Sequence, residues 1–362
     1  MQLGKDTKKV RELKTQNEQV SGPQASQNGA FREENLQVDL NELDEHRERK
    51  MIGGRWTFIG FQNPTSYALG TSNRGLKVLD ESKIVYYKEL PGGGQLRDIV
   101  YVDHLNCYLL SYRDIIFRKD IDTKDPYPIM NLHCCRRFGA SFRYSKLNTR
   151  LITCWRNFVY VVNVDRKQVE IVIKRSNLMG VEDFRIFGEK ENKLVFLSST
   201  GFVHLFSISY SLKKICRDQS YKIKLDSVSE SALSVAVCDK GQYILAGLAD
   251  QSTFRSSRLI ILRVDGRSLV KLATLDLQYG RIGMQYALEF FGSAGNHILW
   301  VGLSMSGYVH LYDLNCGTGY FREVVDKRVQ SREENMWKIH RLGEKLYYTG
   351  YGAKVIELSL TI

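Results

Sequence analysis

Cysteine and histidine, the side chains that most often bind metal ions, stand together at one point of the chain. His133 is followed directly by the vicinal pair Cys134 and Cys135. Neighbouring residues of an extended segment point to alternate sides, so these three side chains cannot converge on one ion. The chain has 7 cysteines, an odd number, and no CxxC spacing. This pattern excludes a disulfide framework or a zinc knuckle and favours a reducing compartment.

A second histidine pair occupies equivalent places in two similar segments, "GFVHLF" with His204 and "GYVHLY" with His310. Two equivalent histidines could bind one metal ion. The same place in other segments holds Tyr160, Phe117 and Val78, which is the behaviour of a packing position. We therefore expect half-buried structural histidines, no metal and no cofactor.

The run Leu90–Gln95, "LPGGGQ", is the only glycine run of the chain that could hold a phosphate. Loops that bind phosphate open onto the N-terminus of a helix, whereas this run is flanked by two apolar segments of strand type. No nucleophile and base, paired carboxylates or metal cluster occurs at a catalytic spacing. We expect a blade connection here and no catalytic residues.

The segments that carry these residues repeat along the chain. "KLVFLSSTGFVHLFSIS" and "HILWVGLSMSGYVHLYDLN" share a strand–turn–strand pattern, and five further segments have it. The expected turns lie near residues 75, 114, 157, 201, 250–258, 307 and 353. The first four are 39, 43 and 44 residues apart, the period of a four-stranded propeller blade. We predict an all-β chain, a seven-bladed β-propeller of four-stranded antiparallel blades.

The hairpins, together with Tyr312-Asp313 where a Trp-Asp dipeptide would stand, resemble the WD-repeat class of propellers. The chain is also similar to expanded groups of uncharacterised propeller-like proteins of ciliates. The resemblance covers some 310 residues and implies a propeller that serves as a binding platform. No segment has Trp-Asp itself, and the Gly-His dipeptide of the class is missing. The Asp–His hydrogen-bond network of that class is therefore not expected.

The N-terminal region has a different composition. Residues 1–34 are rich in Lys, Gln, Ser, Glu and Asn, so we expect a mostly disordered or partly helical tail before a propeller over 35–362. The chain ends on "AKVIELSLTI", a third strand, which leaves the last blade one strand short. We predict that Asn35–Leu40 closes the ring beside Val355–Leu360, because an open edge invites aggregation.

Composition bounds the compartment and the kind of partner. No apolar run reaches the length of a membrane span, and the N-terminus has no apolar signal core, so an intracellular protein of cytoplasm or nucleus is expected. The net charge is +12, and residues 51–362 alone carry +13. The part that folds is the basic part.

Arginine recurs on one face of the predicted propeller, at the turns after second strands and in the connections to first strands. A planar guanidinium binds carboxylate or phosphate through two hydrogen bonds and stacks on aromatic rings. The other face should carry Asp80, Asp103, Asp120, Asp122, Asp125 and Asp165 among basic residues and be nearly neutral. The predicted partner-binding residues are Arg74, Tyr112, Arg113, Trp155, Arg156, Arg136, Arg137, Arg255, Arg258 and Arg281.

These features predict a non-catalytic protein-interaction scaffold, a monomeric propeller within a complex, whose Arg-rich face docks an acidic or phosphorylated protein segment. A nucleic-acid binder on the same face is an alternative, with Phe138, Phe142 and Tyr144 stacking bases beside Arg136, Arg137 and Arg143. An enzyme with its site in the central channel is a third alternative. A convergent cluster of titratable groups in the channel would be its sign.

Overall fold

The computed structural model describes most of the chain from residue 37 onward. The described residues are 37–42, 57–71, 75–81, 83–90, 96–112, 115–132, 141–155, 158–174, 181–250, 252, 257–266, 268–277, 285–304, 308–328, 336–343, 345–350 and 355–361. The predicted tail, residues 1–34, lies outside them.

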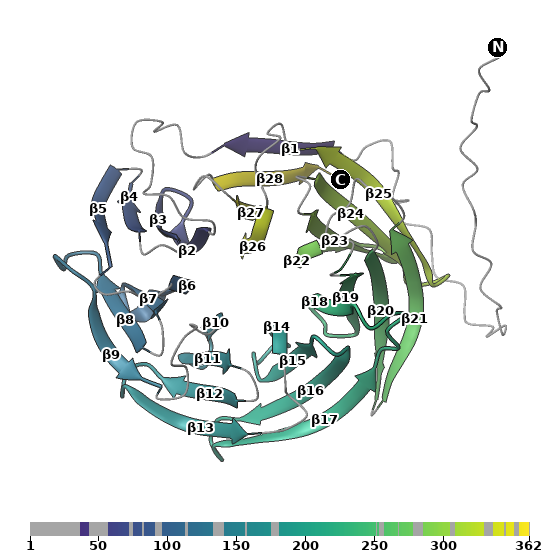
Figure 1. The fold of residues 1–362 in the computed structure, drawn as a ribbon, viewed down its shortest axis with the longest axis horizontal. Helices are drawn as coiled ribbons and strands as arrows, with labels where there is room; N and C mark the ends of the chain where they lie inside the picture. The colour runs from purple at the N-terminus through teal and green to yellow at the C-terminus, as the bar shows by residue number, and fades with distance from the viewer. Residues whose placement is uncertain are drawn as a thin grey trace, which may run out of the picture. The chain divides into compact units, whose positions relative to one another are not determined.

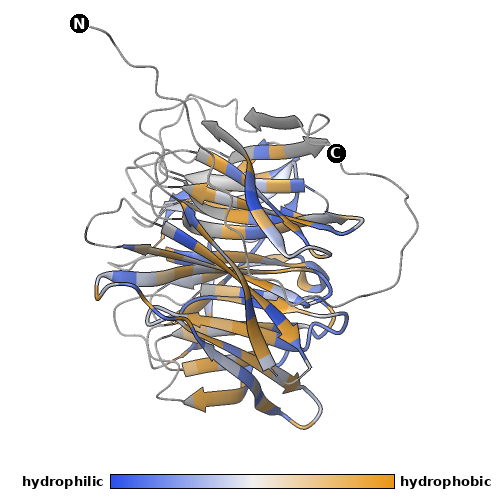
Figure 2. Cartoon of the chain, turned by 90° about the vertical axis from the view of Figure 1, so that its right-hand side faces the viewer, coloured by the Kyte–Doolittle hydropathy of each residue, from blue (hydrophilic) through white to orange (hydrophobic). Residues whose placement is uncertain are grey.

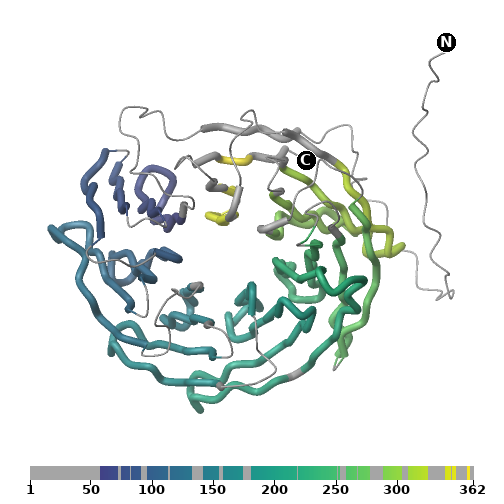
Figure 3. Tube along the Cα trace, in the orientation of Figure 1, coloured from purple at the N-terminus to yellow at the C-terminus, as the bar shows by residue number. Residues whose placement is uncertain are grey.

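The described residues form seven four-stranded antiparallel sheets that follow one another around a central channel (Figure 1). This is the seven-bladed β-propeller that the sequence predicts. The chain trace passes from each blade to its neighbour in sequence order, as the colours of Figure 3 show. No described helix is long and apolar enough to cross a membrane.

The first four blades have their strands in chain order from the channel outward. Blade 1 consists of β2 (Thr57–Asn63), β3 (Ser66–Thr71), β4 (Gly75–Asp80) and β5 (Lys83–Glu89). Blade 2 consists of β6 (Leu96–Val102), β7 (Cys107–Tyr112), β8 (Ile115–Asp120) and β9 (Tyr127–Asn131), with the 3-10 turn η2 (Asp103–Leu105) after β6. Blade 3 consists of β10 (Ser141–Ser145), β11 (Arg150–Trp155), β12 (Phe158–Asn163) and β13 (Gln168–Lys174). Blade 4 consists of β14 (Val181–Phe187), β15 (Lys193–Ser198), β16 (Phe202–Ser209) and β17 (Lys214–Lys222).

The last three blades complete the ring. Blade 5 consists of β18 (Glu230–Val237), β19 (Tyr243–Asp250), β20 (Ser257–Asp265) and β21 (Ser268–Leu277). Blade 6 consists of β22 (Gln285–Ala294), β23 (His297–Ser304), β24 (Tyr308–Asn315) and β25 (Tyr320–Arg328). Blade 7 consists of β26 (Met336–Leu342), β27 (Lys345–Gly350), β28 (Val355–Thr361) and, from the other end of the chain, β1 (Gln37–Glu42).

The outer strand of blade 7 comes from the N-terminal region. β1 runs antiparallel to β28 from the pair Gln37 and Thr361 to the pair Glu42 and Ile356. The segment expected from the sequence, Asn35–Leu40, overlaps this strand and starts two residues earlier. Pairing residues 37–42 with 356–361 covers the edge that β28 would otherwise expose.

The core lies between the blades. Second and third strands are buried on both faces, as in β19, where residues 244–249 are all buried, while the outer strand β5 is mostly exposed. Each cluster of buried apolar residues combines two neighbouring blades: Ile152 of blade 3, for example, shares one with Phe196 of blade 4. Adjacent sheets therefore stabilise each other, and a blade has little core of its own. Figure 2 shows the hydrophobic residues along the strands.

Antiparallel order places the connections on two opposite rims. The upper rim is the side with the turns from second to third strands and the connections from each fourth strand to the next first strand. The lower rim is the side with the turns from first to second and from third to fourth strands. On the lower rim the described turns carry both acidic and basic residues, among them Asp122, Asp125 and Lys124.

The two equivalent histidines are structural, as expected, but more deeply buried than half. His204 and His310 are 2% and 0% exposed. The His204 ring stacks on Phe202, with centroids 5.6 Å apart. The Nδ1 atom of His310 lies 2.6 Å from a carboxylate oxygen of Glu323.

Candidate functional site

The first strands line the central channel, and charged residues converge there. A one-residue β-bulge near the start of β6 and of β14 brings Asp98 and Asp183 to equivalent places in blades 2 and 4. Asp98 is 2% exposed, and the side chain of Asp183 is 13% exposed. Carboxylates as buried as these need hydrogen-bond partners to remain charged.

Both carboxylates join their own blade to the next one. Asp98 accepts hydrogen bonds from the backbone N–H of Ile99 (3.0 Å) and, across the blade boundary, of Phe142 (2.8 Å). Asp183 accepts the N–H of Phe184 (2.8 Å) and, across its boundary, of Val235 (3.1 Å). The same side chain thus makes the same bridge from blade 2 to blade 3 and from blade 4 to blade 5.

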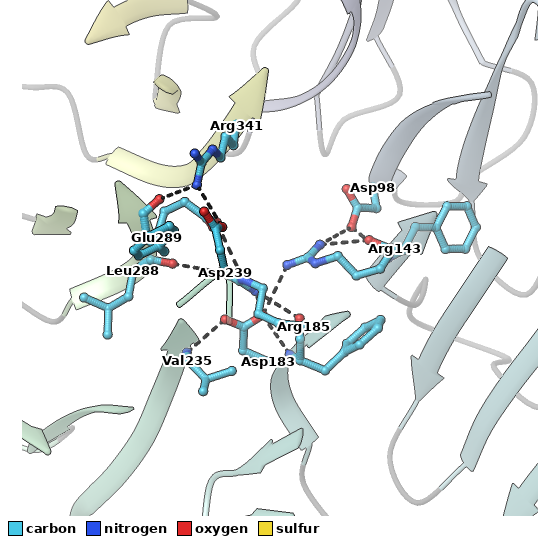
Figure 4. A network of polar contacts seen from close by, with 12 residues as sticks. Asp98, Arg143, Asp183, Arg185, Val235, Asp239, Leu288, Glu289 and Arg341 are labelled. Atoms are coloured by element: carbon cyan, nitrogen blue, oxygen red, sulfur yellow. Dashed lines mark hydrogen bonds and ion pairs between the residues drawn. The ribbon is translucent and has the colours of Figure 1, made fainter. Parts of the chain in front are cut away.

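Two arginines at equivalent places of β10 and β14 surround these carboxylates (Figure 4). Arg143 lies 3.2 Å from Asp183 and 3.8 Å from Asp98, and it donates to the Phe142 carbonyl oxygen. Burial, and then the nearby charge of Arg185, lower the pKa of Arg143. The guanidinium of Arg143 therefore links blades 2, 3 and 4.

Arg185 spans a longer distance. It pairs with Asp183 and donates to the Leu288 carbonyl oxygen of blade 6 at 2.9 Å. Burial alone would lower the pKa of Arg185, but Asp183 and Glu289 outweigh it, so the pKa is raised. Blade 5 has Ala236 at the equivalent place, a buried residue of the core between blades 5 and 6.

Glu289 and Arg341 complete the cluster. Glu289 lies 3.6 Å from Arg185, and burial raises its pKa although Arg185 and Arg143 oppose the shift. Arg341 lies 3.5 Å from Asp239 and donates to the Phe290 carbonyl oxygen at 3.4 Å. A channel cavity of about 300 Å³ is lined by Asp98, Arg143, Arg185, Glu289 and Arg341.

The channel therefore contains the convergent titratable cluster that would be the sign of an enzyme. The geometry of the cluster is that of a link between blades. We call this cluster the channel brace: Asp98, Arg143, Asp183, Arg185, Glu289 and Arg341. The oxygens of Asp98 and Asp183 accept backbone N–H groups. Arg143 binds carboxylates of blades 2 and 4, and Arg185 binds a carbonyl oxygen of blade 6. A general base or nucleophile needs a lone pair directed at a substrate, and these two carboxylates use theirs within the protein. No group of residues that could hold a metal ion occurs in the described part of the chain.

A second constellation lies on the lower rim, where His104 stands between Tyr144 and Asp165. Its ring nitrogens lie 2.9 Å from the Tyr144 hydroxyl and 2.5 Å from an Asp165 oxygen. The order Asp–His–Tyr matches that of an orienting acid, a base and a nucleophile. Burial, and then Asp165 and Asp103, raise the pKa of Tyr144, the opposite of what an activated nucleophile needs. We interpret this group as a hydrogen-bonded link between blades 2 and 3.

Asp313, which stands where the WD class has its Asp, does have a histidine partner. Its oxygens lie 2.9 and 3.0 Å from Nδ1 of His297. His297 begins β23, the second strand of the same blade. This Asp–His pair, which the sequence did not lead us to expect, links the second and third strands of blade 6.

The structure corrects two of the predicted partner-binding residues. Tyr112 is 2% exposed and packs in the core between blades 1 and 2, because its place in β7 points inward. Arg258 is bound within the protein: it pairs with Asp226 at 2.8 Å and also with Glu230. Neither side chain is available as an anchor for a partner.

Of the other predicted partner-binding residues, only Trp155 lies among the residues that the structure describes. Trp155 ends β11 beside the turn of its blade. The remaining predicted arginines lie outside the described residues: Arg74, Arg113, Arg156, Arg136, Arg137, Arg255 and Arg281.

The structure also argues against the nucleic-acid alternative, because the described residues proposed for it are engaged within the protein. Phe142 is 3% exposed, and Arg143 belongs to the channel brace. Tyr144 lies against His104. Only unstacked, accessible rings can stack on bases, so this strand offers no such platform.

Comparisons with known proteins agree on the fold. No protein-family model matches the chain, and no curated protein does. Among solved structures, the WD40 β-propeller domain of Doa1 aligns with a TM-score of 0.61 and 11% identity, covering 88% of this chain and 95% of that one. A chain from a Saccharomyces cerevisiae complex of Dbp5 with Nup159, Gle1, IP6 and ADP aligns with a TM-score of 0.60 and 12% identity, covering 91% and 96%. The chain has the fold of WD40 β-propellers. The likeness to ciliate propeller-like proteins stays a prediction.

Proposed function

We propose that this chain is a non-catalytic scaffold, a monomeric propeller inside a larger intracellular complex, that docks an acidic or phosphorylated segment of a partner protein on its upper rim. One observation carries the proposal: the charged groups that converge in the channel bind each other and the backbone of other blades. The channel is then a structural element, and the two rims are the surfaces left for recognition.

The upper rim is the better docking surface for an anion because of its arginines. With Tyr112 and Arg258 removed from the set, four predicted arginines still fall, in sequence, between a second and a third strand: Arg74, Arg113, Arg156 and Arg255. Arginine is enriched at the centres of interfaces, where bidentate bonds and ring stacking give it more binding energy than lysine. Residues 51–362 carry a net charge of +13, which favours an acidic partner over a basic one.

The experiment that tests this proposal uses the double variant Arg113→Ala/Arg156→Ala. Binding of fluorescent peptides rich in Glu or phosphoserine is followed by anisotropy. We expect affinity to fall about tenfold or more, since each charge-assisted pair contributes about 1.5–3 kcal/mol. Arg263→Ala is the matched control, because Arg263 lies close to the lower-rim end of β20 with a side chain 48% exposed. Equal affinity of the double variant and the wild type would refute the assignment of the face.

A further inference from the structure

Four turns on the lower rim of blades 3 and 4 form a single hydrogen-bonded unit, which we call the lower platform: residues 146–149, 164–167, 188–192 and 209–213. Glu191 connects three of them. Its carboxylate accepts the Leu147 backbone N–H at 3.0 Å, and its carbonyl oxygen accepts the Tyr210 hydroxyl at 2.9 Å. Asn148 adds a bond of 2.8 Å to the Lys190 carbonyl oxygen.

The fourth turn joins the unit through a buried ion pair. Arg150 binds Glu170 at 2.6 Å and donates to the Asn148 carbonyl oxygen at 3.0 Å. Asn163 donates to the same glutamate and accepts the Arg166 backbone N–H. The lower platform thus spans two blades and is held in one conformation before any partner arrives, which lowers the entropic cost of binding.

Two leucines stand on this platform without cover. Leu147 is 66% exposed and Leu212 is 76% exposed. Among the described large aliphatic side chains only Val228 is more exposed, and the others that are exposed lie on outer strands: Ile84, Val85, Val172 and Val270. The turns of both leucines contact Glu191, so two exposed apolar side chains stand on one hydrogen-bonded unit. A partner that covers this unit would bury both of them.

The charges of the platform are unbalanced in one direction. Its acidic groups are largely satisfied: Glu191 binds Ser145 and Leu147, and Asp165 binds His104. No described carboxylate lies within ion-pair distance of the platform's exposed cations Arg166, Lys167, Lys190 and Lys213. The exposed carboxylates of the platform are Asp165, which binds His104, and Glu189. The platform therefore carries an excess of positive charge together with two exposed leucines.

We infer that the lower platform docks a segment of a partner protein that carries apolar side chains flanked by acidic residues. The leucines would bury the apolar side chains, and the four cations would attract the acidic ones. A second copy of the same platform is disfavoured because its cations would face these cations. Nucleic acid would use the cations and leave the leucines exposed, and an anionic membrane would meet Glu189, Asp165 and Asp103 on the same rim.

A peptide selection tests the inference. A library of random peptides displayed on phage is selected against the immobilised chain, and the enriched peptides are synthesised and titrated by anisotropy. We expect them to combine Asp or Glu with Leu, Phe or Trp. They should bind Leu147→Ser/Leu212→Ser and Lys190→Glu/Lys213→Glu about tenfold more weakly or worse than the wild type, and addition of salt should weaken binding to the wild type.

The controls separate this platform from the upper rim. Ile84→Ser/Val85→Ser removes a comparable pair of exposed aliphatic side chains on β5 and should leave affinity unchanged. Arg113→Ala/Arg156→Ala should also leave it unchanged, so the proposed function can fail while this inference stands, and the reverse. Circular dichroism verifies that each variant folds.

Several outcomes would overturn the inference. They are a selection without enrichment, peptides that bind the leucine variant as tightly as the wild type, and peptides lost only in the arginine variant. The wild type could instead bind anionic vesicles or a single-stranded oligonucleotide, and the platform variants could lose that binding. This result would assign the platform to those ligands and not to a protein segment.

Discussion

The guanidinium of Arg185 donates to the carbonyl oxygen of Leu288 at 2.9 Å, although the two residues are 103 positions apart and lie in blades 4 and 6. This contact bridges blades that are not neighbours. With Asp183 and Glu289 it makes Arg185 the most connected charge of the channel. A propeller whose blades have little core of their own gains rigidity from such a bond.

Replacing Arg185 should therefore destabilise the whole ring. Arg185→Met keeps much of the side-chain volume but removes the cation that pairs with Glu289 and leaves Asp183 with Arg143 alone. We expect the free energy of unfolding to fall by about 3 kcal/mol or more, measured by urea denaturation. Arg263→Met, at an exposed arginine, should change it by less than about 0.5 kcal/mol. Equal effects of the two substitutions would show that the brace contributes no stability.

The aspartate bridges give a local prediction. In Asp183→Asn and Asp98→Asn one oxygen is replaced by an NH2 group, which cannot accept a backbone N–H. We expect Asp183→Asn to speed amide hydrogen exchange at Val235 or Phe184, and Asp98→Asn at Phe142 or Ile99.

Each of these variants is the control for the other, because the two bridges lie at different blade boundaries. Stability should fall by about 1–3 kcal/mol in both. Exchange that changes equally at both boundaries in both variants would argue against two separate local bridges.

Closure of the ring by β1 predicts a sharp difference between two truncations. Deletion of residues 1–42 removes the strand that covers β28, so the melting temperature should fall by about 5 °C or more and aggregation should increase. Deletion of residues 1–30 keeps β1 and should leave the melting temperature unchanged. Differential scanning fluorimetry distinguishes the two, and equal tolerance of both truncations would remove the role of β1.

Glu289 gives the ring a pH dependence whose sign follows from burial. Its pKa in the folded state is raised above the ordinary value of 4.5, so the folded state binds its proton more tightly than the unfolded state. The contribution of Glu289 to stability is therefore fully present below pH 4.5 and declines as pH rises through the folded-state pKa.

Glu289→Gln cannot titrate, and it isolates this effect. The stability of the variant relative to the wild type should increase as pH rises from about 4 to 7. Thermal unfolding of both proteins over this range measures the difference. A difference that stays constant, or that decreases with pH, would contradict the prediction.

The number of blades could be predicted because the strand–turn–strand segment occurs once in each blade, and its first four turns are 39, 43 and 44 residues apart. The channel brace was missed because its members come from five different blades and β-bulges shift Asp98 and Asp183 in register. A signal did exist: Phe142-Arg143 and Phe184-Arg185 repeat the same dipeptide 42 residues apart, one blade length. A repeated charge on an innermost strand indicates a channel residue.

The surface residues were harder to predict for a physical reason. A residue at the end of a strand can point into the core or outward, and a shift of one position decides which, as at Tyr112. Arg258 could not be distinguished from an exposed arginine, because its partner Glu230 is 28 residues away. Leu147 and Leu212 sit in short turns whose contact through Glu191 no local pattern indicates.

Hydrogen–deuterium exchange of the chain with and without a bound acidic peptide tests most directly the claim that the rims recognise partners while the channel holds the blades together. Peptides selected on the wild-type protein should protect turns on a rim and leave the amides of β6, β10, β14 and β22 unchanged. Protection confined to those four channel strands would contradict the account and make the channel the binding site.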